Sequence, residues 1–463
     1  MAEMLAHQSN AELLIVHVLD SSESHEQNDW PGTEAANRDL ERWLLEPTPP
    51  SSSLTVSHAL LEGNPAEDIQ AADWPQFLGP NRDGISAETG LLSEWTDESA
   101  AEVWRVAGGA GMSGLAIREG KLVTLIQNAG RQRIVAYNSA TGERLWQNPI
   151  APTYRNAMGH GPRATPTIVG DRVFVFTGEG ILAAVDFSSG DTVWEQDVFS
   201  GTGGKPAEYG TACSPLVIGK LVVVTAGSPA ATMVAYDIET GQKKWGAGSD
   251  PAGYSSPSVL NVAGQMQLVA FTGNSLLGLH PKTGAALWRH PYVTEFRCNT
   301  ATPLSVDGEV FISSGENHGS VLLKLQAVNG AFEISEAWQS QGVRSVMRNE
   351  WQTSILLDGH LYGFDNVGSA GQVTHLTCIE ASTGKRVWQE ARFGKGNMIS
   401  ADGKLFMSTM KGEVVIARAS PTGYQELGRK RVIETTRQAP ALADGRLYLR
   451  DEEEIVCLDV RQK

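Results

Sequence analysis

Side chains able to bind an anion or a flat ligand recur at matching positions along this 463-residue chain. Arg163, Lys395 and Arg437 supply positive charge at these positions, and Tyr254 and Trp351 supply aromatic surfaces. Cations that converge in a low-dielectric funnel concentrate the field for an anion, and aromatic faces stack on planar groups and on cations. We therefore predict a pocket for a planar or carboxylate-bearing ligand, or for an extended peptide.

The matching positions share one register, each three residues before a column of turn residues. The alternative to a binding pocket is that the cations pair with acidic residues of the same loops, such as Glu208, Glu295 and Glu350, because loops carry much solvated charge as well as function. Both interpretations stay open. The eight positions are Gly111, Arg163, Ala212, Tyr254, Thr300, Trp351, Lys395 and Arg437. With nearby loop residues, the candidate ligand-binding set is Arg163, Tyr254, Arg297, Asn299, Trp351, Lys395, Asn397 and Arg437.

A repeated phrase sets this register. Apolar alternation before a Thr-Gly or similar corner favours a strand, and the glycine supplies the positive φ of a tight hairpin. Two more apolar segments precede each phrase, so each unit of about 40 to 50 residues holds four predicted strands. The glycine lies four residues before a tryptophan in AYNSATGERLW (Trp146), AVDFSSGDTVW (Trp194), AYDIETGQKKW (Trp245), GLHPKTGAALW (Trp288) and CIEASTGKRVW (Trp388).

Eight units fit between residue 100 and the C-terminus, although two are degenerate. LQAVNGAFEISEAW reaches Trp338 through a longer turn, and ARASPTGYQEL near Tyr424 lacks the tryptophan. The last unit stops after its third strand, 454–460, while an unpaired strand around Trp104 precedes the first complete unit. Pairing those two strands closes a ring and removes exposed sheet edges. The aligned column is Gly114, Pro166, Pro215, Pro257, Pro303, Ser354, Met398 and Pro440.

The predicted fold is therefore all-β, an eight-bladed β-propeller of four-stranded antiparallel blades closed by an N-terminal strand. A linear β-solenoid is the alternative, and the three-plus-one arrangement of the terminal strands disfavours it. The repeated tryptophans are predicted to pack between neighbouring blades, with the indole N–H on a backbone acceptor. These structural docking residues are Trp104, Trp146, Trp194, Trp245, Trp288, Trp338 and Trp388.

Composition excludes several function classes. The net charge is −16, and residues 1–73 hold 14 acidic and 2 basic side chains, so most of the negative charge precedes the repeats. This disfavours nucleic-acid binding and separates two segments. No apolar run predicts a membrane span, and the N-terminus lacks the pattern of a signal peptide. The cysteines, Cys213, Cys298, Cys378 and Cys457, show no metal-ligand spacing, so no metal site is expected.

Residues 1–72 form a different predicted domain. A continuous apolar strand at 13–18, a helical pattern at 33–46 and a second strand-like segment, LTVSHALLEG, indicate an α/β unit with a parallel sheet. The segments LLIVHV and EGNPAEDI resemble the middle of a universal stress protein. That family's glycine-rich phosphate loop should follow Ala72, where the chain reads DWPQFLGP, so ATP binding is not expected.

Residues 73–463 are predicted to be the propeller domain. The tryptophan phrase resembles the docking repeat of PQQ-like propellers, a superfamily that includes quinoprotein alcohol dehydrogenases and the BamB lipoproteins of outer-membrane β-barrel assembly. The segment DWPQFLGPNRDGIS at 73–86 resembles the start of a group of exported bacterial PQQ-like proteins. The resemblance implies a periplasmic or cell-envelope location, whereas the N-terminal resemblance implies a cytoplasmic one. The compartment stays open.

Three functions are consistent with these resemblances. The preferred one is a non-enzymatic, BamB-like scaffold that binds a protein, peptide or ligand at the propeller mouth. The second is a quinoprotein alcohol dehydrogenase, for which the resemblance implies PQQ with calcium, a vicinal cysteine pair and a Glu, Asn and Asp set. This chain has no Cys-Cys and no aspartate in the mouth column, so no catalytic residue is assigned. The third is a stress-related fusion with a nucleotide-binding segment.

Overall fold

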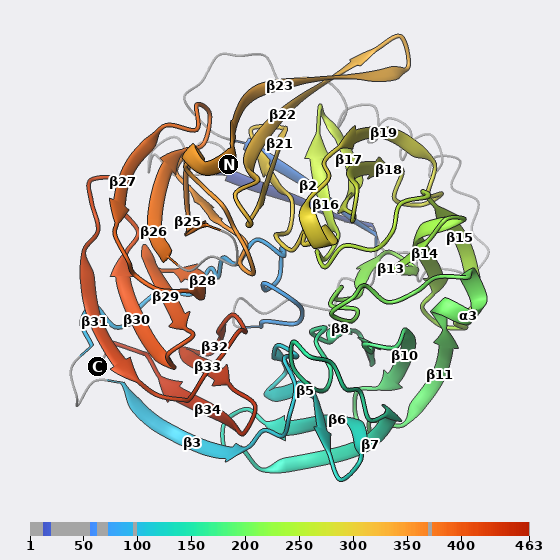
Figure 1. Cartoon of the computed structure of the whole chain (residues 1–463). Helices are drawn as coiled ribbons and strands as arrows, with labels where there is room; N and C mark the ends of the chain where they lie inside the picture. Colours follow the sequence, from blue (N-terminus) through green and yellow to red (C-terminus); the bar gives the residue numbers. More distant parts are fainter. Residues whose placement is uncertain (1–12, 20–55, 63–72, 96–99, 369–372, 463) are drawn as a thin grey trace, which may run out of the picture. The chain divides into compact units, whose positions relative to one another are not determined.

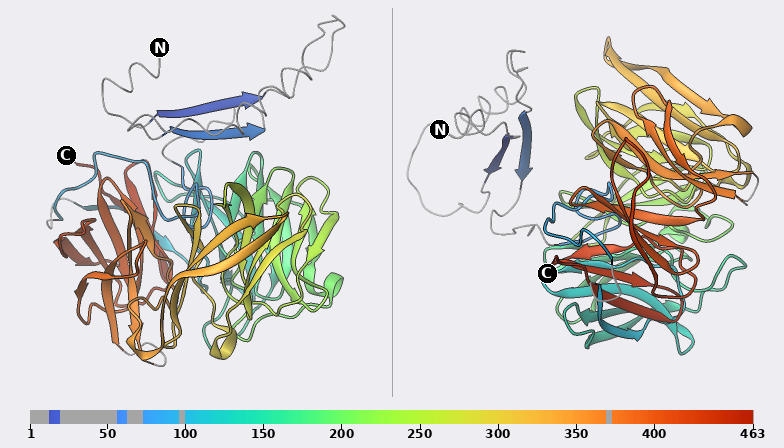
Figure 2. Two further views of the ribbon diagram at one scale, coloured as in Figure 1. Left: turned by 90° about the horizontal axis from the view of Figure 1, so that it is seen from above. Right: turned by 90° about the vertical axis from the view of Figure 1, so that its left-hand side faces the viewer.

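The computed structural model describes residues 13–19, 56–62, 73–95, 100–368 and 373–462. The chain divides into two compact units, Met1–Asp68 and Ile69–Lys463. In the first unit, β1 (Leu13–Leu19) and β2 (Val56–Glu62) pair in parallel along their whole length (Figure 2). The strand expected at 13–18 and the parallel pairing are therefore present. The expected helices of this segment lie outside the described residues.

The second unit is an eight-bladed propeller of four-stranded antiparallel sheets, as the repeats predicted (Figure 1). Blade 1 contains β4 (Ala116–Arg118), β5 (Lys121–Asn128), β6 (Arg131–Asn138) and β7 (Arg144–Pro152). Blade 2 contains β8 (Thr167–Val169), β9 (Arg172–Phe176), β10 (Ile181–Asp186) and β11 (Thr192–Asp197). Blade 3 contains β12 (Leu216–Ile218), β13 (Leu221–Ser228), β14 (Ala231–Asp237) and β15 (Lys243–Ala247). Blade 4 contains β16 (Ser258–Val262), β17 (Gln265–Phe271), β18 (Ser275–Leu279) and β19 (Ala286–Pro291).

The second half of the ring repeats this order. Blade 5 contains β20 (Leu304–Val306), β21 (Glu309–Ser314), β22 (Gly319–Val328) and β23 (Ala331–Gln341). Blade 6 contains β24 (Ile355–Leu357), β25 (His360–Val367), β26 (Val373–Glu380) and β27 (Arg386–Glu390). Blade 7 contains β28 (Gly396–Ala401), β29 (Lys404–Thr409), β30 (Glu413–Arg418) and β31 (Glu426–Arg431). Short helical turns α3 (Val198–Thr202), η1 (Glu295–Arg297) and η2 (Gly342–Arg344) lie in the connections.

Blade 8 closes the ring by joining the two ends of the propeller. It contains β32 (Ala441–Ala443), β33 (Arg446–Arg450), β34 (Glu454–Asp459) and, as its outer strand, β3 (Ala101–Ala107), which pairs with β34 antiparallel. In this pairing Trp104 is opposite Cys457. The predicted closure by the strand around Trp104 is confirmed, and it leaves no gap between the first and last blades.

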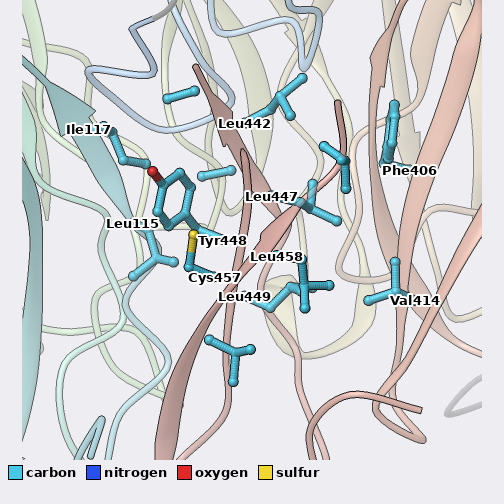
Figure 3. Packing of buried hydrophobic residues seen from close by; sticks show 14 of the residues in the cluster. Leu115, Ile117, Phe406, Val414, Leu442, Leu447, Tyr448, Leu449, Cys457 and Leu458 are labelled. Carbon is cyan, nitrogen blue, oxygen red and sulfur yellow. The ribbon is translucent and has the colours of Figure 1, made fainter. Parts of the chain in front are cut away.

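The hydrophobic core lies between neighbouring blades. Alternate residues of each strand face opposite sides of its sheet, so both faces of a blade are apolar and each packs on the next blade. At the closure, Ile117 of β4, Tyr448 of β33 and Phe406 of β29 belong to one buried cluster that spans blades 7, 8 and 1 (Figure 3). Cys378 and Cys457 are buried in the third strands of their blades, and all four cysteines are free thiols.

Tryptophans of the outer strands connect most blades to the following one. Trp194 donates its indole N–H to Ile238 O at 2.8 Å, and its ring covers Gly241 of the next blade. A Cβ at Gly241 would lie 2.8 Å from that ring, so a side chain does not fit there. The same arrangement joins Trp104 to Ser139 and Gly142, and Trp338 to Ala381 and Gly384.

Four tryptophans depart from this arrangement. Trp146 and Trp245 cover Gly190 and Gly284, yet among the described residues their indole N–H groups have no hydrogen-bond partner. At the degenerate blade 5 the hairpin β22–β23 is long and projects from the ring (Figure 1), and Trp288 bonds Gln267 of its own blade instead. At the degenerate blade 7, Trp388 still bonds Ser420 O at 2.9 Å but packs against Tyr424.

Residues 73–95, which we call the strap, close one end of the central channel. Trp74 pairs with Ile117 of β4, Ile85 with Ser400 of β28, and Leu91 with Arg461 after β34. The buried Arg82 donates to Ser214 O at 3.1 Å and Pro215 O at 2.9 Å, just before β12. The strap therefore bonds to blades on opposite sides of the ring, and Figure 1 shows it in blue across the centre.

Candidate functional site

The candidate site is a cavity of about 590 Å³ in the central channel. Trp74, Phe77 and Leu78 of the strap line one end of the cavity and form its floor, and we call the other end the mouth. The loops that enter the innermost strands converge at the mouth. Seven of the eight column positions line the cavity: Arg163, Ala212, Tyr254, Thr300, Trp351, Lys395 and Arg437.

One wall of the cavity stacks two cations on a tryptophan. Lys395 Nζ lies 4.3 Å from the centre of the Trp351 ring and the guanidinium carbon of Arg437 lies 5.1 Å from it. Lys395 also forms an ion pair with Glu350 at 2.7 Å. Cation–π contacts and the ion pair hold the ring and both charges in fixed positions. The result is a positive aromatic wall supplied by blades 6, 7 and 8.

A second part of the wall is aromatic and adjoins Arg163. The Tyr209 and Tyr254 rings stack 5.9 Å apart, and the Tyr254 hydroxyl accepts from the Tyr209 N–H at 3.1 Å. Burial raises the pKa of Tyr254, so its hydroxyl stays protonated. The Arg163 guanidinium carbon lies 4.8 Å from the centre of the Tyr154 ring. These contacts suit flat or anionic groups better than neutral polar ones.

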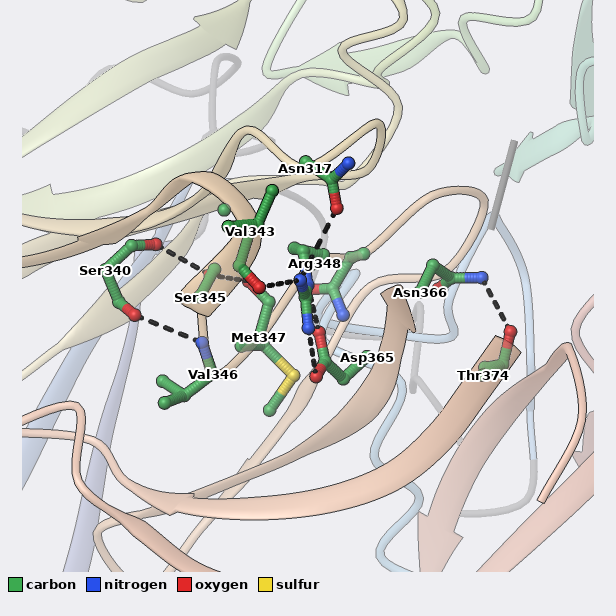
Figure 4. A network of polar contacts seen from close by, with 12 residues as sticks. Asn317, Ser340, Val343, Ser345, Val346, Met347, Arg348, Asp365, Asn366 and Thr374 are labelled. Carbon is green, nitrogen blue, oxygen red and sulfur yellow. Dashed lines mark hydrogen bonds and ion pairs between the residues drawn. The ribbon is translucent and has the colours of Figure 1, made fainter. Parts of the chain in front are cut away.

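A buried polar network holds the loop that carries Trp351. Arg348 makes a bidentate ion pair with Asp365 of β25 at 2.6 and 2.8 Å, and donates to Val343 O at 3.2 Å (Figure 4). Asn366 donates to the Glu350 carboxylate at 3.0 Å and to Thr374. Because Arg348 and Glu350 belong to the loop that carries Trp351, these bonds fix the position of the positive wall.

The eight predicted ligand-binding residues fall into two groups. Six of them line the cavity: Arg163, Tyr254, Trp351, Lys395, Asn397 and Arg437. Asn299 is buried and bonded to Thr272 O at 2.7 Å, so its amide supports the loop, and Arg297 is exposed outside the lining. The expected pairing of Glu350 with a cation is present, with Lys395 as its partner.

Sequence reasoning missed the floor and part of the rim. The floor residues belong to the strap. The strap carries no repeat phrase, so its residues could not be aligned with the column that predicts the mouth. Phe296, Cys298 and Glu316 line the rim, outside the eight-residue column. Burial and the nearby Glu316 and Glu350 raise the pKa of the Cys298 thiol to about 11. In the sequence, the signal for the rim was an apolar residue, Phe296, in a predicted loop.

The cavity does not have the donors of a calcium site. Ca²⁺ binds six to eight oxygens, several of them from carboxylates. Among the described residues no three His, Cys, Asp or Glu side chains gather in a way that could hold a metal ion. Of the two lining carboxylates, Glu350 is bonded to Lys395 and Asn366. The residues present therefore do not fit the calcium that a PQQ enzyme would need.

Sequence comparison identifies the family of the propeller. The family model described as outer membrane protein assembly factor BamB matches residues 85–204, 130–390 and 374–463. BamB of Shewanella oneidensis is 26% identical over 207 residues, 44% of this chain and 49% of that protein. BamB of Yersinia pestis is 21% identical over 327 residues, 68% of this chain and 78% of that protein. The chain thus spans about half the length of the first of these relatives. The resemblance of residues 1–72 to universal stress proteins is not supported by these comparisons.

Solved structures share the fold. The quinohemoprotein alcohol dehydrogenase of Comamonas testosteroni has a TM-score of 0.63 and 15% identity, covering 86% of this chain and 82% of that one. BamB of Moraxella catarrhalis has a TM-score of 0.54 and 15% identity, covering 79% and 98%. Identities this low show a common fold and leave function to the site. On the extent of the family match, the chain belongs to the family of the outer membrane protein assembly factor BamB.

Proposed function

We propose that this protein is a non-enzymatic propeller scaffold that binds a protein or peptide partner at its mouth, in the manner of an outer membrane protein assembly factor. The observation that carries the proposal is the one-ended cavity within a BamB-family propeller. The strap closes the floor, so a bound segment enters and leaves at the mouth. No helix among the described residues is long and apolar enough to cross a membrane.

The direct test is the outer-membrane protein content of cells that lack this protein. We expect quantitative mass spectrometry to show reduced levels of several outer-membrane proteins, restored by wild-type chain. The triple variant Arg163→Gln/Lys395→Gln/Arg437→Gln should fold and fail to restore them. Unchanged levels in the deleted strain would contradict the assembly role, and full rescue by the triple variant would move the docking site away from the mouth.

The quinoprotein hypothesis is the second candidate, because the positive aromatic wall suits a planar polycarboxylate such as PQQ. The missing calcium donors count against it. Incubation with PQQ and Ca²⁺, followed by absorbance and dye-linked alcohol oxidation, separates the two functions. A stable quinone absorbance with alcohol-dependent dye reduction would replace the scaffold proposal with an enzymatic one.

For the N-terminal part, we propose that residues 1–72 and 73–463 are two domains, the first derived from a universal stress protein. The parallel pair β1–β2 and the separation into two compact units support this assignment. Without a glycine-rich phosphate loop, the segment should not retain ATP on equilibrium dialysis at millimolar nucleotide. Retention of ATP would support the stress-related fusion instead.

A further inference from the structure

Two guanidinium groups lie side by side at the cavity wall. Arg163 donates to Gly159 O at 2.8 Å and to Gly161 O at 2.6 Å, and Arg437 donates to Met158 O at 2.6 Å. The carbonyls of Met158 and Gly159 are consecutive in the chain, so the two cations share one loop. Arg163 is only 8% exposed. Both residues line the cavity, so the pair faces its interior.

In the part of the chain that the structure describes, neither Arg163 nor Arg437 forms an ion pair with a carboxylate. Among the described residues, Arg163 and Arg437 bond carbonyl oxygens and contact aromatic rings, whereas the third cation, Lys395, pairs with Glu350. Burial lowers the pKa of Arg163, and the nearby Arg437 lowers it further. Two like charges in a partly desolvated site repel each other, and a carboxylate placed between them would accept hydrogen bonds from both.

Apolar side chains lie exposed beside the cavity. Phe296 is 58% exposed yet also lines the cavity, and Val343 is 75% exposed on η2. Their loops are joined through His318, which accepts from the Glu295 N–H at 3.2 Å and whose carbonyl accepts from the Gly342 N–H at 3.2 Å. A small acid in the cavity would leave this apolar rim in water. A longer chain would cover the cavity and the rim together.

We propose that the cavity binds a carboxylate of an extended acidic segment of the partner protein, held between Arg163 and Arg437, with a neighbouring apolar side chain on Phe296 and Val343. The proposal rests on the proposed function, because it assumes that a protein docks at the mouth. It adds the chemistry of the docked segment: an acidic group followed by an apolar one, in place of a basic or uncharged peptide.

The test uses methyl NMR of the full chain labelled on methionine. Met112 and Met158 line the cavity, and Met266 is exposed near the start of β17, next to the turn that ends β16 at the opposite end of that strand from the mouth. Three probes are titrated: a blocked tetrapeptide with one aspartate between phenylalanines, its twin with asparagine, and naphthalene-2-carboxylate. We expect the acidic peptide to shift Met112 and Met158 saturably and leave Met266 unchanged, while the asparagine twin shifts none.

Arg437→Gln should weaken the acidic peptide about tenfold or more, because a charge-assisted hydrogen bond is lost. Arg431→Gln, an exposed arginine on outer strand β31, is the matched control and should not change binding. Equal shifts with both peptides, or binding unaffected by Arg437→Gln, would overturn the proposal. Binding of naphthalene-2-carboxylate without the peptide would reassign the site to small planar acids. These results are independent of the outer-membrane protein levels that test the proposed function.

Discussion

At the scale of single residues, the site depends on charges that are already partnered in different ways. Lys395 is neutralised by Glu350, whereas among the described residues Arg163 and Arg437 bond carbonyl oxygens, contact aromatic rings and form no ion pair with a carboxylate. Trp351 lies against two of the three cations. The side chains that hold this arrangement are as important as those that face the ligand, because misplaced charges would repel each other.

The buried pair Arg348–Asp365 provides the first residue-scale prediction. Both side chains are almost fully buried, so Arg348→Ala leaves an uncompensated carboxylate in the interior. We expect a loss of about 3 to 5 kcal/mol in the free energy of unfolding, measured by urea denaturation. Arg386→Ala is the control, since Arg386 is partly exposed and 4.0 Å from Asp365, and should cost less than about 1 kcal/mol. Equal losses would contradict this account of the network.

The thiol of Cys298 provides the second residue-scale prediction. Cys213, Cys378 and Cys457 are buried, so Cys298 should be the one that reacts with iodoacetamide in the folded protein. Because its pKa is raised to about 11, the thiolate fraction should rise tenfold per pH unit from pH 7 to 9.5 without a plateau. Mass spectrometry of labelling at each pH measures the rate. A plateau near pH 9, or unchanged labelling of Cys298→Ser, would show that another thiol or an ordinary pKa is responsible.

At the scale of elements, the repeated phrase acts between blades. The tryptophan of one blade packs on the glycine of the next blade. The glycine and tryptophan that lie four residues apart in one phrase therefore do not contact each other. Gly241 has φ of +68° and receives Trp194, whereas Gly264 has φ of +79° and no atom within 4 Å of a Cβ. Comparing the two glycines therefore separates the effect of the left-handed backbone from the effect of the tryptophan ring.

Gly241→Ala and Gly264→Ala should therefore differ. Both variants pay the cost of a left-handed backbone, about 1 to 2 kcal/mol. Gly241→Ala also collides with the Trp194 ring, which should add about 1 to 3 kcal/mol. Urea denaturation of both variants measures the difference. Equal destabilisation would mean that the ring does not rest on this glycine.

The sequence predicted the elements well because their chemistry is local. Apolar alternation and Thr-Gly corners are read within a dozen residues, and the closing strand around Trp104 follows from counting strands. The hydrogen bonds of the tryptophans were harder to foresee. By its position Trp146 would bond Phe187 O, the carbonyl equivalent to the acceptor of Trp194. Lys121 Nζ bonds that oxygen instead, and this contact joins residues far apart in the sequence.

At the scale of the whole molecule, the strap converts a channel into a pocket. Its backbone bonds reach blades 1, 7 and 8, and Arg82 reaches blade 3. The sequence could place the mouth, because the column follows the repeats. It could not place the floor, because 73–95 has no periodicity and several of its contacts are made with residues more than a hundred positions away, such as Ser214 and Ser400.

Hydrogen exchange tests the strap. The backbone N–H groups of Trp74, Ser86 and Leu92 donate to Ile117 O, Ser400 O and Val460 O at 2.8 to 2.9 Å. We expect these amides to exchange as slowly as those of the inner strands, because they open only when the ring opens. Exchange of strap peptides within seconds, alongside protected blades, would show that the floor of the cavity is not closed in solution.

The most direct test of the mouth as the docking site is photo-crosslinking in cells. A photoreactive amino acid is placed at Phe296 or Val343 on the rim, and at the exposed Met266 near the start of β17, at the other end of its blade. We predict that the two rim positions crosslink to a common protein partner, and that Arg163→Gln/Lys395→Gln/Arg437→Gln abolishes these crosslinks while Met266 gives none. Crosslinks from Met266 alone, or rim crosslinks that survive the triple substitution, would contradict the account.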